Sequence, residues 1–257
     1  MAEERIAEVV AGMDRRLALL PARLSHQQVF LSTYRRTTQA VGVAIEKSTF
    51  EDPAWVERWD VAFADLYLAA LDSELAGGKV SRPWRLAFAA SPRLHPLRQL
   101  LLGINAHVNY DLPQALLTVL SDDDFSDPVL MAQRHRDHQR IDALLSSRVA
   151  AEDDEMSTAG GRRVRDRLLG PLNRLASRRF LREARRKVWH NTYQLQRARA
   201  SGPHEYAVRL AELEVLSAAK IADLLQPGQV LLRLAVAGFG VVLPPPDTAA
   251  PGTAIKP

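Results

Sequence analysis

Apolar residues recur along most of this chain at intervals of three and four, the spacing of amphipathic helices. The alternating β-branched runs and tight-turn dipeptides that indicate strands are almost absent. In the first half of the chain, the pattern predicts helices over 3–24, 26–48 and 53 to Gly77-Gly78, and a short helix from Ser81. Further helices are predicted over 97–109, 113–120 and 129–150, and two or three more follow residue 163. We therefore expect an all-α fold, a single multi-helix bundle packed around the central apolar helix 97–109.

The polar and Pro/Gly-rich stretches predict where helices stop. Residues 121–128 read as a polar turn and 151–163 as an exposed loop, with further breaks at 170–171, 202–203 and 227–228. From residue 243 onward the chain is rich in proline and small residues, which is typical of a disordered tail. The expected organisation is one helical metal-binding domain over 1–242 followed by a tail over 243–257.

The amino-acid composition permits a globular core and excludes several kinds of site. Apolar residues make up 47% of the chain, enough for a sizeable core, and the absence of cysteine excludes disulfides, thiolate metal sites and a cysteine nucleophile. The charged N-terminus lacks the apolar core of a signal peptide. The longest apolar run, 230–243, contains Arg233 and is shorter than the ~20 residues that span a bilayer. We expect a cytoplasmic protein without a membrane span.

The most informative stretch lies at the end of the central apolar helix. His107 and Asp111 are four residues apart, so a helix places both on one face, among apolar neighbours. A buried imidazole and a buried carboxylate are costly unless they are paired or bound to a cation. Pro113 disfavours helix before it and removes an N–H, which predicts a kink or stop beside this polar pair.

A second group of possible ligands follows on the helix predicted over 129–150. His135, His138 and Asp142 lie at i, i+3 and i+7 and share one face, and Asp137 lies beside them. Imidazole together with carboxylate suits Fe, Zn or Mn. The complete set of candidate ligands adds two aspartates of the third helix and one late histidine: His107, Asp111, His135, His138, Asp60, Asp142, Asp137, Asp65 and His190.

Such a set predicts a dinuclear metal site inside a helical bundle, although the usual Glu-x-x-His signature is missing. Metal-bound histidines need an acceptor for the other ring nitrogen, and Asn105 or Asn109 could serve for His107. A simpler interpretation treats each histidine as a surface or core residue and pairs Asp60 and Asp65 with nearby arginines.

The stretch from 162 to 190 is strongly basic, with ten Arg and one Lys against two acidic residues. A basic helix can follow a phosphate backbone, but aromatic residues for base stacking are sparse here, so no nucleic-acid partner is expected. Nucleophile and phosphate-loop motifs are absent from the sequence.

Four segments carry a resemblance to a known family. Residues 105–113, which read Asn-Ala-His-Val-Asn-Tyr-Asp-Leu-Pro, resemble the signature of an actinobacterial family catalogued as a domain of unknown function. Residues 59–67, 135–145 and 184–189 resemble further segments of it, and the likeness covers most of 25–200. The family includes a nonheme diiron monooxygenase that hydroxylates a diterpenoid in platensimycin and platencin biosynthesis. This chain departs from the family pattern at residues 65, 138 and 142.

The resemblance implies an all-helical fold with a diiron site that uses O₂ to hydroxylate a hydrophobic small molecule. Two iron ions, or other divalent metals, would be held by the candidate ligands, and an external electron donor would supply the reductant. Tyr67, Tyr110 and Trp189 are expected to line the substrate pocket. A metal-dependent hydrolase using the same residues, and a non-catalytic interaction module with an Arg-rich face, are the alternatives.

Overall fold

The structure is a computed structural model, and it describes residues 2–141 and 187–226. Every regular element in these two ranges is helical, which confirms the predicted fold class. A 3₁₀ turn (Ala22–Leu24) and a π-helical turn (His107–Asp111) interrupt the α-helices, and two further helical stretches cover 128–141 and 187–201. The labelled helices are α1 (Ala2–Leu19), α2 (Gln27–Glu46), α3 (Pro53–Leu75), α4 (Arg82–Phe88), α5 (Pro96–Ala106), α6 (Leu112–Val119), α7 (Asp122–Ser126) and α10 (Pro203–Leu225).

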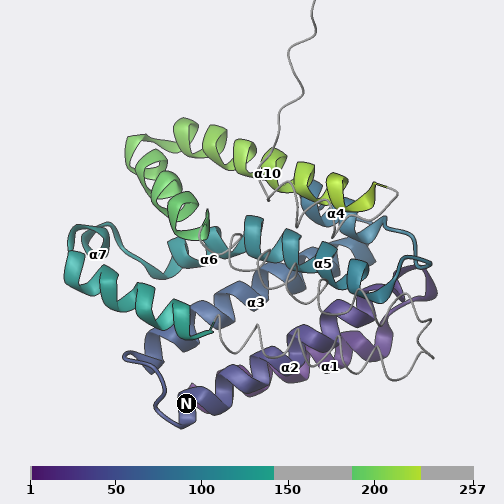
Figure 1. The fold of residues 1–257 in the computed structure, drawn as a ribbon, viewed down its shortest axis with the longest axis horizontal. Coiled ribbons are helices and arrows are strands. Elements are labelled where there is room, and N and C mark those ends of the chain that lie inside the picture. The colour runs from purple at the N-terminus through teal and green to yellow at the C-terminus, as the bar shows by residue number, and fades with distance from the viewer. Residues whose placement is uncertain (1, 142–186, 227–257) are drawn as a thin grey trace, which may run out of the picture.

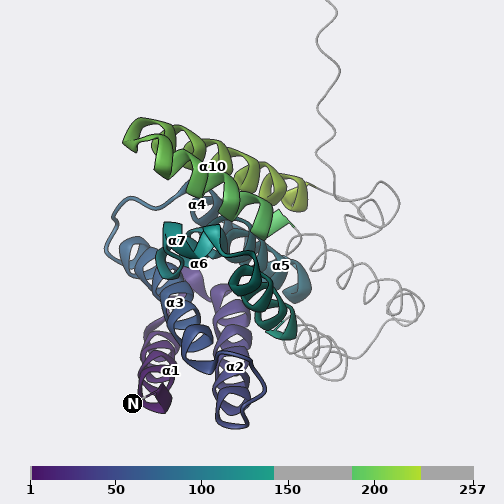
Figure 2. The same cartoon turned by 90° about the vertical axis from the view of Figure 1, so that its left-hand side faces the viewer.

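The helices surround the consecutive segments α5 and α6. In Figure 1, α1 and α2 lie below them and α10 runs above them, and α3 passes beside α6. Figure 2, the view turned by 90°, also shows α1, α2 and α3 grouped on one side and α10 on the other. The segment 97–109, which the sequence places at the centre, is thus enclosed by α2, α4 and α10.

The core is rich in aromatic residues, and one glycine controls how closely they approach the central helix. A Cβ atom added at Gly103 of α5 would lie 2.3 Å from Cγ of Phe30 on α2, well inside contact distance. Since only glycine leaves this space, Gly103 lets the Phe30 ring lie directly against α5. Phe30 is 3% exposed and contacts the ring of His107, so this packing also shapes the surroundings of that histidine.

Most predicted helix positions agree with the structure, and three differ for identifiable reasons. The helix predicted over 3–24 ends at Leu19, because Pro21 lies in an extended conformation before the separate 3₁₀ turn. The helix expected over 97–109 ends at Ala106 and continues as the π-helical turn. The polar stretch 121–128 contains the short helix α7, because Ser121 and Asp124 form a reciprocal capping box at its start. Asp52 caps α3 by accepting the N–H of Trp55, as expected for a helix that starts at Asp-Pro.

Several expectations fall on other parts of the chain. The loop over 151–163, the end of the helix over 129–150, the breaks at 170–171 and 227–228 and the tail from 243 lie outside the described residues. Within residues 2–141 and 187–226, no helix combines the length and the apolar character that a bilayer span requires.

Candidate functional site

The π-helical turn holds the buried histidine–aspartate pair that the sequence singles out. The N–H of Leu112 donates to the carbonyl of His107, a hydrogen bond that closes the wider π turn. Pro113 has no N–H to offer the carbonyl of Asn109, which accounts for the change of helix geometry at this point. His107 and Asp111 are 2% and 3% exposed, so the predicted burial of both side chains is confirmed.

The two side chains of this pair bond to each other and to a tryptophan. Nδ1 of His107 lies 2.9 Å from Oδ2 of Asp111, and Nε1–H of Trp84 donates to the same oxygen at 2.8 Å. The prediction that Asn105 or Asn109 accepts the hydrogen bond of His107 is wrong. Those two side chains bond to each other at 2.7 Å, and Asp111 takes the role instead.

Aromatic rings from α2, α3 and α4 surround the imidazole of His107. Phe63 of α3 stacks on the imidazole at a centroid distance of 3.5 Å and an interplanar angle of 5°. Tyr34 of α2 meets the imidazole edge-on at 4.6 Å. The remaining rings within 6.0 Å belong to Phe30, Tyr67 and Trp84. Inside this enclosure Nε2 of His107 is buried and has no hydrogen-bond partner among the described residues.

Burial governs the protonation of the pair. It lowers the pKa of His107 well below its usual value and raises the pKa of Asp111 well above its usual value, the latter opposed by the Trp84 hydrogen bond. Both groups therefore favour their uncharged forms when nothing else is bound. A cation at Nε2 would replace the proton there, leaving Nδ1–H to donate to an ionised Asp111.

A second buried carboxyl group lies nearby on α3. Asp60 is 4% exposed, its Oδ2 atom has no hydrogen-bond partner in the described part of the chain, and burial raises its pKa to about 7. Asp60 precedes Phe63, the ring stacked on His107, by one helical turn. Burial is the main cause that raises the pKa of Tyr34, and the negative charges of Asp60 and Asp111 raise it further. Both carboxyl groups therefore lie close enough to Tyr34 to affect its ionisation.

Asp60 also borders a small internal cavity. The cavity measures about 40 Å³, which exceeds the space that one water molecule needs. Three hydroxyl-bearing side chains of α2, from Thr33, Tyr34 and Thr37, share its wall with Asp60 and apolar residues. A cavity with these polar groups can hold a water molecule or a small ion beside the carboxyl group.

The histidines of the 128–141 stretch do not join the His107 pair. His138 is buried and lies against Trp59 and Trp189, whereas His135 is exposed and meets the ring of Trp189 edge-on. The rings of Phe63 and Trp59 stand between His107 and His138. Across residues 2–141 and 187–226, no group of three His, Asp or Glu side chains is arranged to hold a metal ion.

Asp137 has a structural role that the sequence did not reveal. It is fully buried, and its two carboxylate oxygens accept the backbone N–H groups of Glu51 and Asp52, each at 2.8 Å. Arg140 adds an ion pair at 2.5 Å. Asp137 therefore ties the loop before α3 to the 128–141 stretch, and its oxygens are already used.

The other predicted site residues are spread over the structure. Asp65 and His190 are exposed, and Asp142 lies outside the described residues. Tyr67 is fully buried against His107, and Trp189 packs on His135 and His138. Tyr110 is half-buried, and burial is the main cause that raises its pKa to about 12.

The sequence does not single out the side chains that surround His107, which include those of Phe30, Tyr34, Phe63 and Trp84. Their helical spacing indicates burial, but nothing in the sequence indicates which ring meets the imidazole. The Gly103 position, one helical turn before His107, was the available signal for a close aromatic approach.

Comparison with known proteins gives one result. A model of a family of unknown function (DUF5995) matches residues 6–227. No curated protein and no solved structure matches the chain. Because the match extends over most of the chain, the protein belongs to this family of unknown function.

Proposed function

We propose that the protein is a metal-dependent oxygenase that hydroxylates a hydrophobic small molecule with O₂, and that His107 and Asp60 bind the metal. One observation carries the proposal: His107 is oriented by a buried carboxyl group while its other ring nitrogen, Nε2, is buried and has no partner within the described residues. This is the arrangement of metal-binding histidines, in which a carboxylate holds Nδ1–H and Nε2 faces the metal.

The chemical types of the two proposed donor atoms suit a metal ion. An imidazole nitrogen and a carboxylate oxygen suit iron, zinc or manganese. The second donor, Asp60, is equally buried, and its Oδ2 atom lacks a partner in the described residues. In number these two donors make only part of a dinuclear centre, so the expected two iron ions require further ligands. Asp142, a candidate from the sequence, lies outside the described residues.

The residues around His107 would fix and shield such a site. Asp111 holds the imidazole in one orientation and makes Nε2 a better donor, and Trp84 holds Asp111 in turn. The stacked ring of Phe63 and the edge of Tyr34 keep water from the imidazole. Bound iron would supply the oxidising power for inserting one oxygen atom of O₂ into a C–H bond, with electrons from an external donor.

Metal binding tests the proposal directly. Titration of the metal-free chain with Co²⁺ under argon, followed by visible absorption, is expected to show saturable binding in the wild type. The His107→Ala and Asp60→Asn variants should bind at least tenfold more weakly. Asp65→Asn is the matched control, since Asp65 lies on the same helix but is exposed. Equal binding by His107→Ala and the control would overturn the proposal.

A metal-dependent hydrolase is a second candidate, favoured by the same His107–Asp111 geometry. A histidine whose Nδ1 is held by a carboxylate can also accept a proton from water through Nε2. Oxygen consumption coupled to a reductant would support the oxygenase. Metal-dependent cleavage of bis(4-nitrophenyl) phosphate without oxygen uptake would support the hydrolase.

A further inference from the structure

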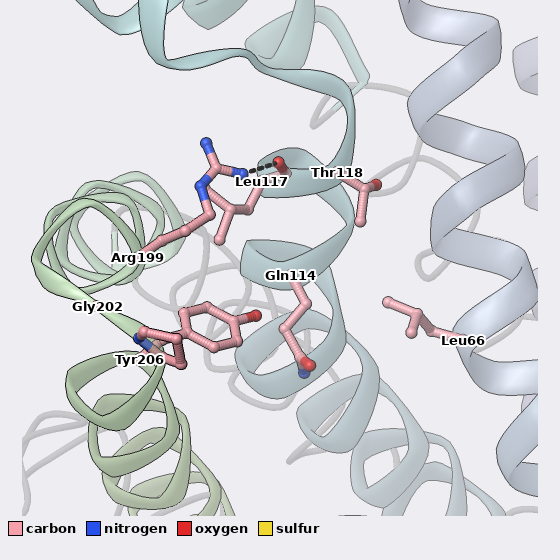
Figure 3. Close-up of a pocket in the computed structure, with 8 residues that line it drawn as sticks. Leu66, Gln114, Leu117, Thr118, Arg199, Gly202 and Tyr206 are labelled. Carbon is pink, nitrogen blue, oxygen red and sulfur yellow. Dashed lines mark hydrogen bonds between the residues drawn. The ribbon is translucent and has the colours of Figure 1, made fainter.

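A pocket of about 400 Å³ opens where α6 meets α10 and α3. We call it the α6–α10 pocket. Figure 3 shows Tyr206 and Arg199 on one side, Leu66 of α3 on the other and Gln114 between them. The complete lining is Leu66, Gln114, Leu117, Thr118, Arg199, Gly202, Pro203 and Tyr206. Its volume lies in the range of about 300–1,000 Å³ that is typical of small-molecule sites.

The charge in the wall of this pocket is already compensated. The guanidinium group of Arg199 donates to the carbonyl of Leu117 at 3.0 Å and to the carboxylate of Asp122 at 2.6 Å. Arg199 thus closes the C-terminal end of α6 and is paired with an acidic side chain. A ligand in the pocket meets no uncompensated positive charge, which disfavours an anion.

The rest of the wall offers apolar surface and, in Gln114, a side chain that can accept a hydrogen bond. Leu66, Leu117 and the ring of Tyr206 supply the apolar part. The amide nitrogen of Gln114 donates to the carbonyl of Tyr110 at 2.8 Å, and this hydrogen bond fixes the side chain. The amide oxygen of Gln114 is then the atom that can accept a hydrogen bond from a ligand hydroxyl. This set matches an uncharged molecule with a large apolar body.

The pocket also lies close to the His107 pair along the chain. Gln114 follows Asp111 by three residues and Thr118 follows Gln114 by four, so these positions form one stripe along the helix. Tyr110, whose carbonyl holds Gln114, belongs to the π-helical turn itself. A ligand in the α6–α10 pocket would therefore contact Gln114, whose side chain is bonded to the turn that carries His107 and Asp111.

We infer that the α6–α10 pocket binds an uncharged, largely apolar small molecule whose hydroxyl group donates to Gln114. Naming this molecule the substrate rests on the proposed function, but the binding itself requires no metal. Failure of the metal titration and failure of this binding are therefore separate results.

The test uses the metal-free full-length chain and a neutral fluorescent probe, N-phenyl-1-naphthylamine. Its emission should rise saturably with the wild type. Thr118→Trp places a large ring at the exposed mouth of the pocket and should weaken binding at least tenfold. Val208→Trp, at an exposed position of α10 outside the lining, is the matched control and should bind like the wild type. Thermal melts followed by circular dichroism establish that both variants fold.

A second probe tests the chemical class of the ligand. The anionic 8-anilinonaphthalene-1-sulfonate, which has a similar ring system, should bind at least tenfold more weakly than the neutral probe. Tighter binding of the anion that is lost in Arg199→Gln would overturn the assignment of an uncharged ligand. Absence of saturable emission with the neutral probe, or equal binding by Thr118→Trp and Val208→Trp, would overturn the site itself.

Discussion

The free energy of unfolding of the metal-free protein should depend on pH through Asp60, and the substitution Asp60→Asn isolates this contribution. Burial raises the pKa of this carboxyl group from 3.8 to about 7 in the folded chain. Because the folded pKa exceeds the unfolded one, folding takes up a proton between these values. The stabilisation is complete below the unfolded pKa and is lost as the pH rises through about 7.

The size of the effect follows from the two pKa values. A carboxyl group that titrates near 3.8 unfolded and near 7 folded removes about 2.5 kcal/mol of unfolding free energy between pH 5 and pH 8. Asp60→Asn keeps the shape of the side chain but cannot ionise, so this contribution disappears. Other titrating groups affect both proteins alike and cancel in the difference.

Urea denaturation of both proteins at several pH values measures this difference. In the presence of chelator, the wild type should lose about 2.5 kcal/mol more than Asp60→Asn from pH 5 to pH 8. Saturating Co²⁺ should abolish the extra loss, because the cation replaces the proton on Asp60. Parallel pH dependences of the two metal-free proteins would show that Asp60 is not buried without a partner, and the reasoning would fail.

Three further substitutions test the packing and the hydrogen bonds around the site. Gly103→Ala forces the Phe30 ring away from α5 and should destabilise the fold by about 1–3 kcal/mol in urea melts. Asp137→Ala removes the acceptor of two partly buried N–H groups and one of the two ion pairs of Arg140, and should cost about 1–3 kcal/mol, with increased hydrogen exchange at the loop before α3. Trp84→Phe removes the hydrogen bond to Asp111 together with part of a fully buried ring, so a loss of at least about 1–3 kcal/mol is expected, and an unchanged melting temperature would contradict that bond.

The helical architecture could be predicted because it depends on local patterns. The apolar periodicity placed α2 and α3 to within a few residues, and Asp52-Pro53 marked the start of α3. The spacing of His107 and Asp111, among apolar neighbours, correctly indicated that both are buried. Pro113 correctly indicated an irregular helix beside them, although not its π geometry.

Contacts between distant parts of the chain could not be predicted in this way. Asp137 looked like a ligand because it lies beside two histidines, yet it binds backbone N–H groups 85 and 86 residues away. His135 and His138 share a helical face by spacing, but a face is wide enough for one residue to be exposed while the other is buried. Which partner a polar group meets is decided by packing, and a single sequence does not record it.

Buried polar groups in this fold differ in how far their hydrogen bonds are satisfied, and this difference identifies the site better than residue type does. Asp137 is fully buried, but three donors satisfy its carboxylate, so it serves the fold. Asp60 and His107 each leave a buried atom without a partner in the described residues, which costs about 1–3 kcal/mol for each group. In the proposed metal site, a cation bound to both atoms would offset this cost. We therefore assign the proposed metal site to the region between α3 and the π-helical turn.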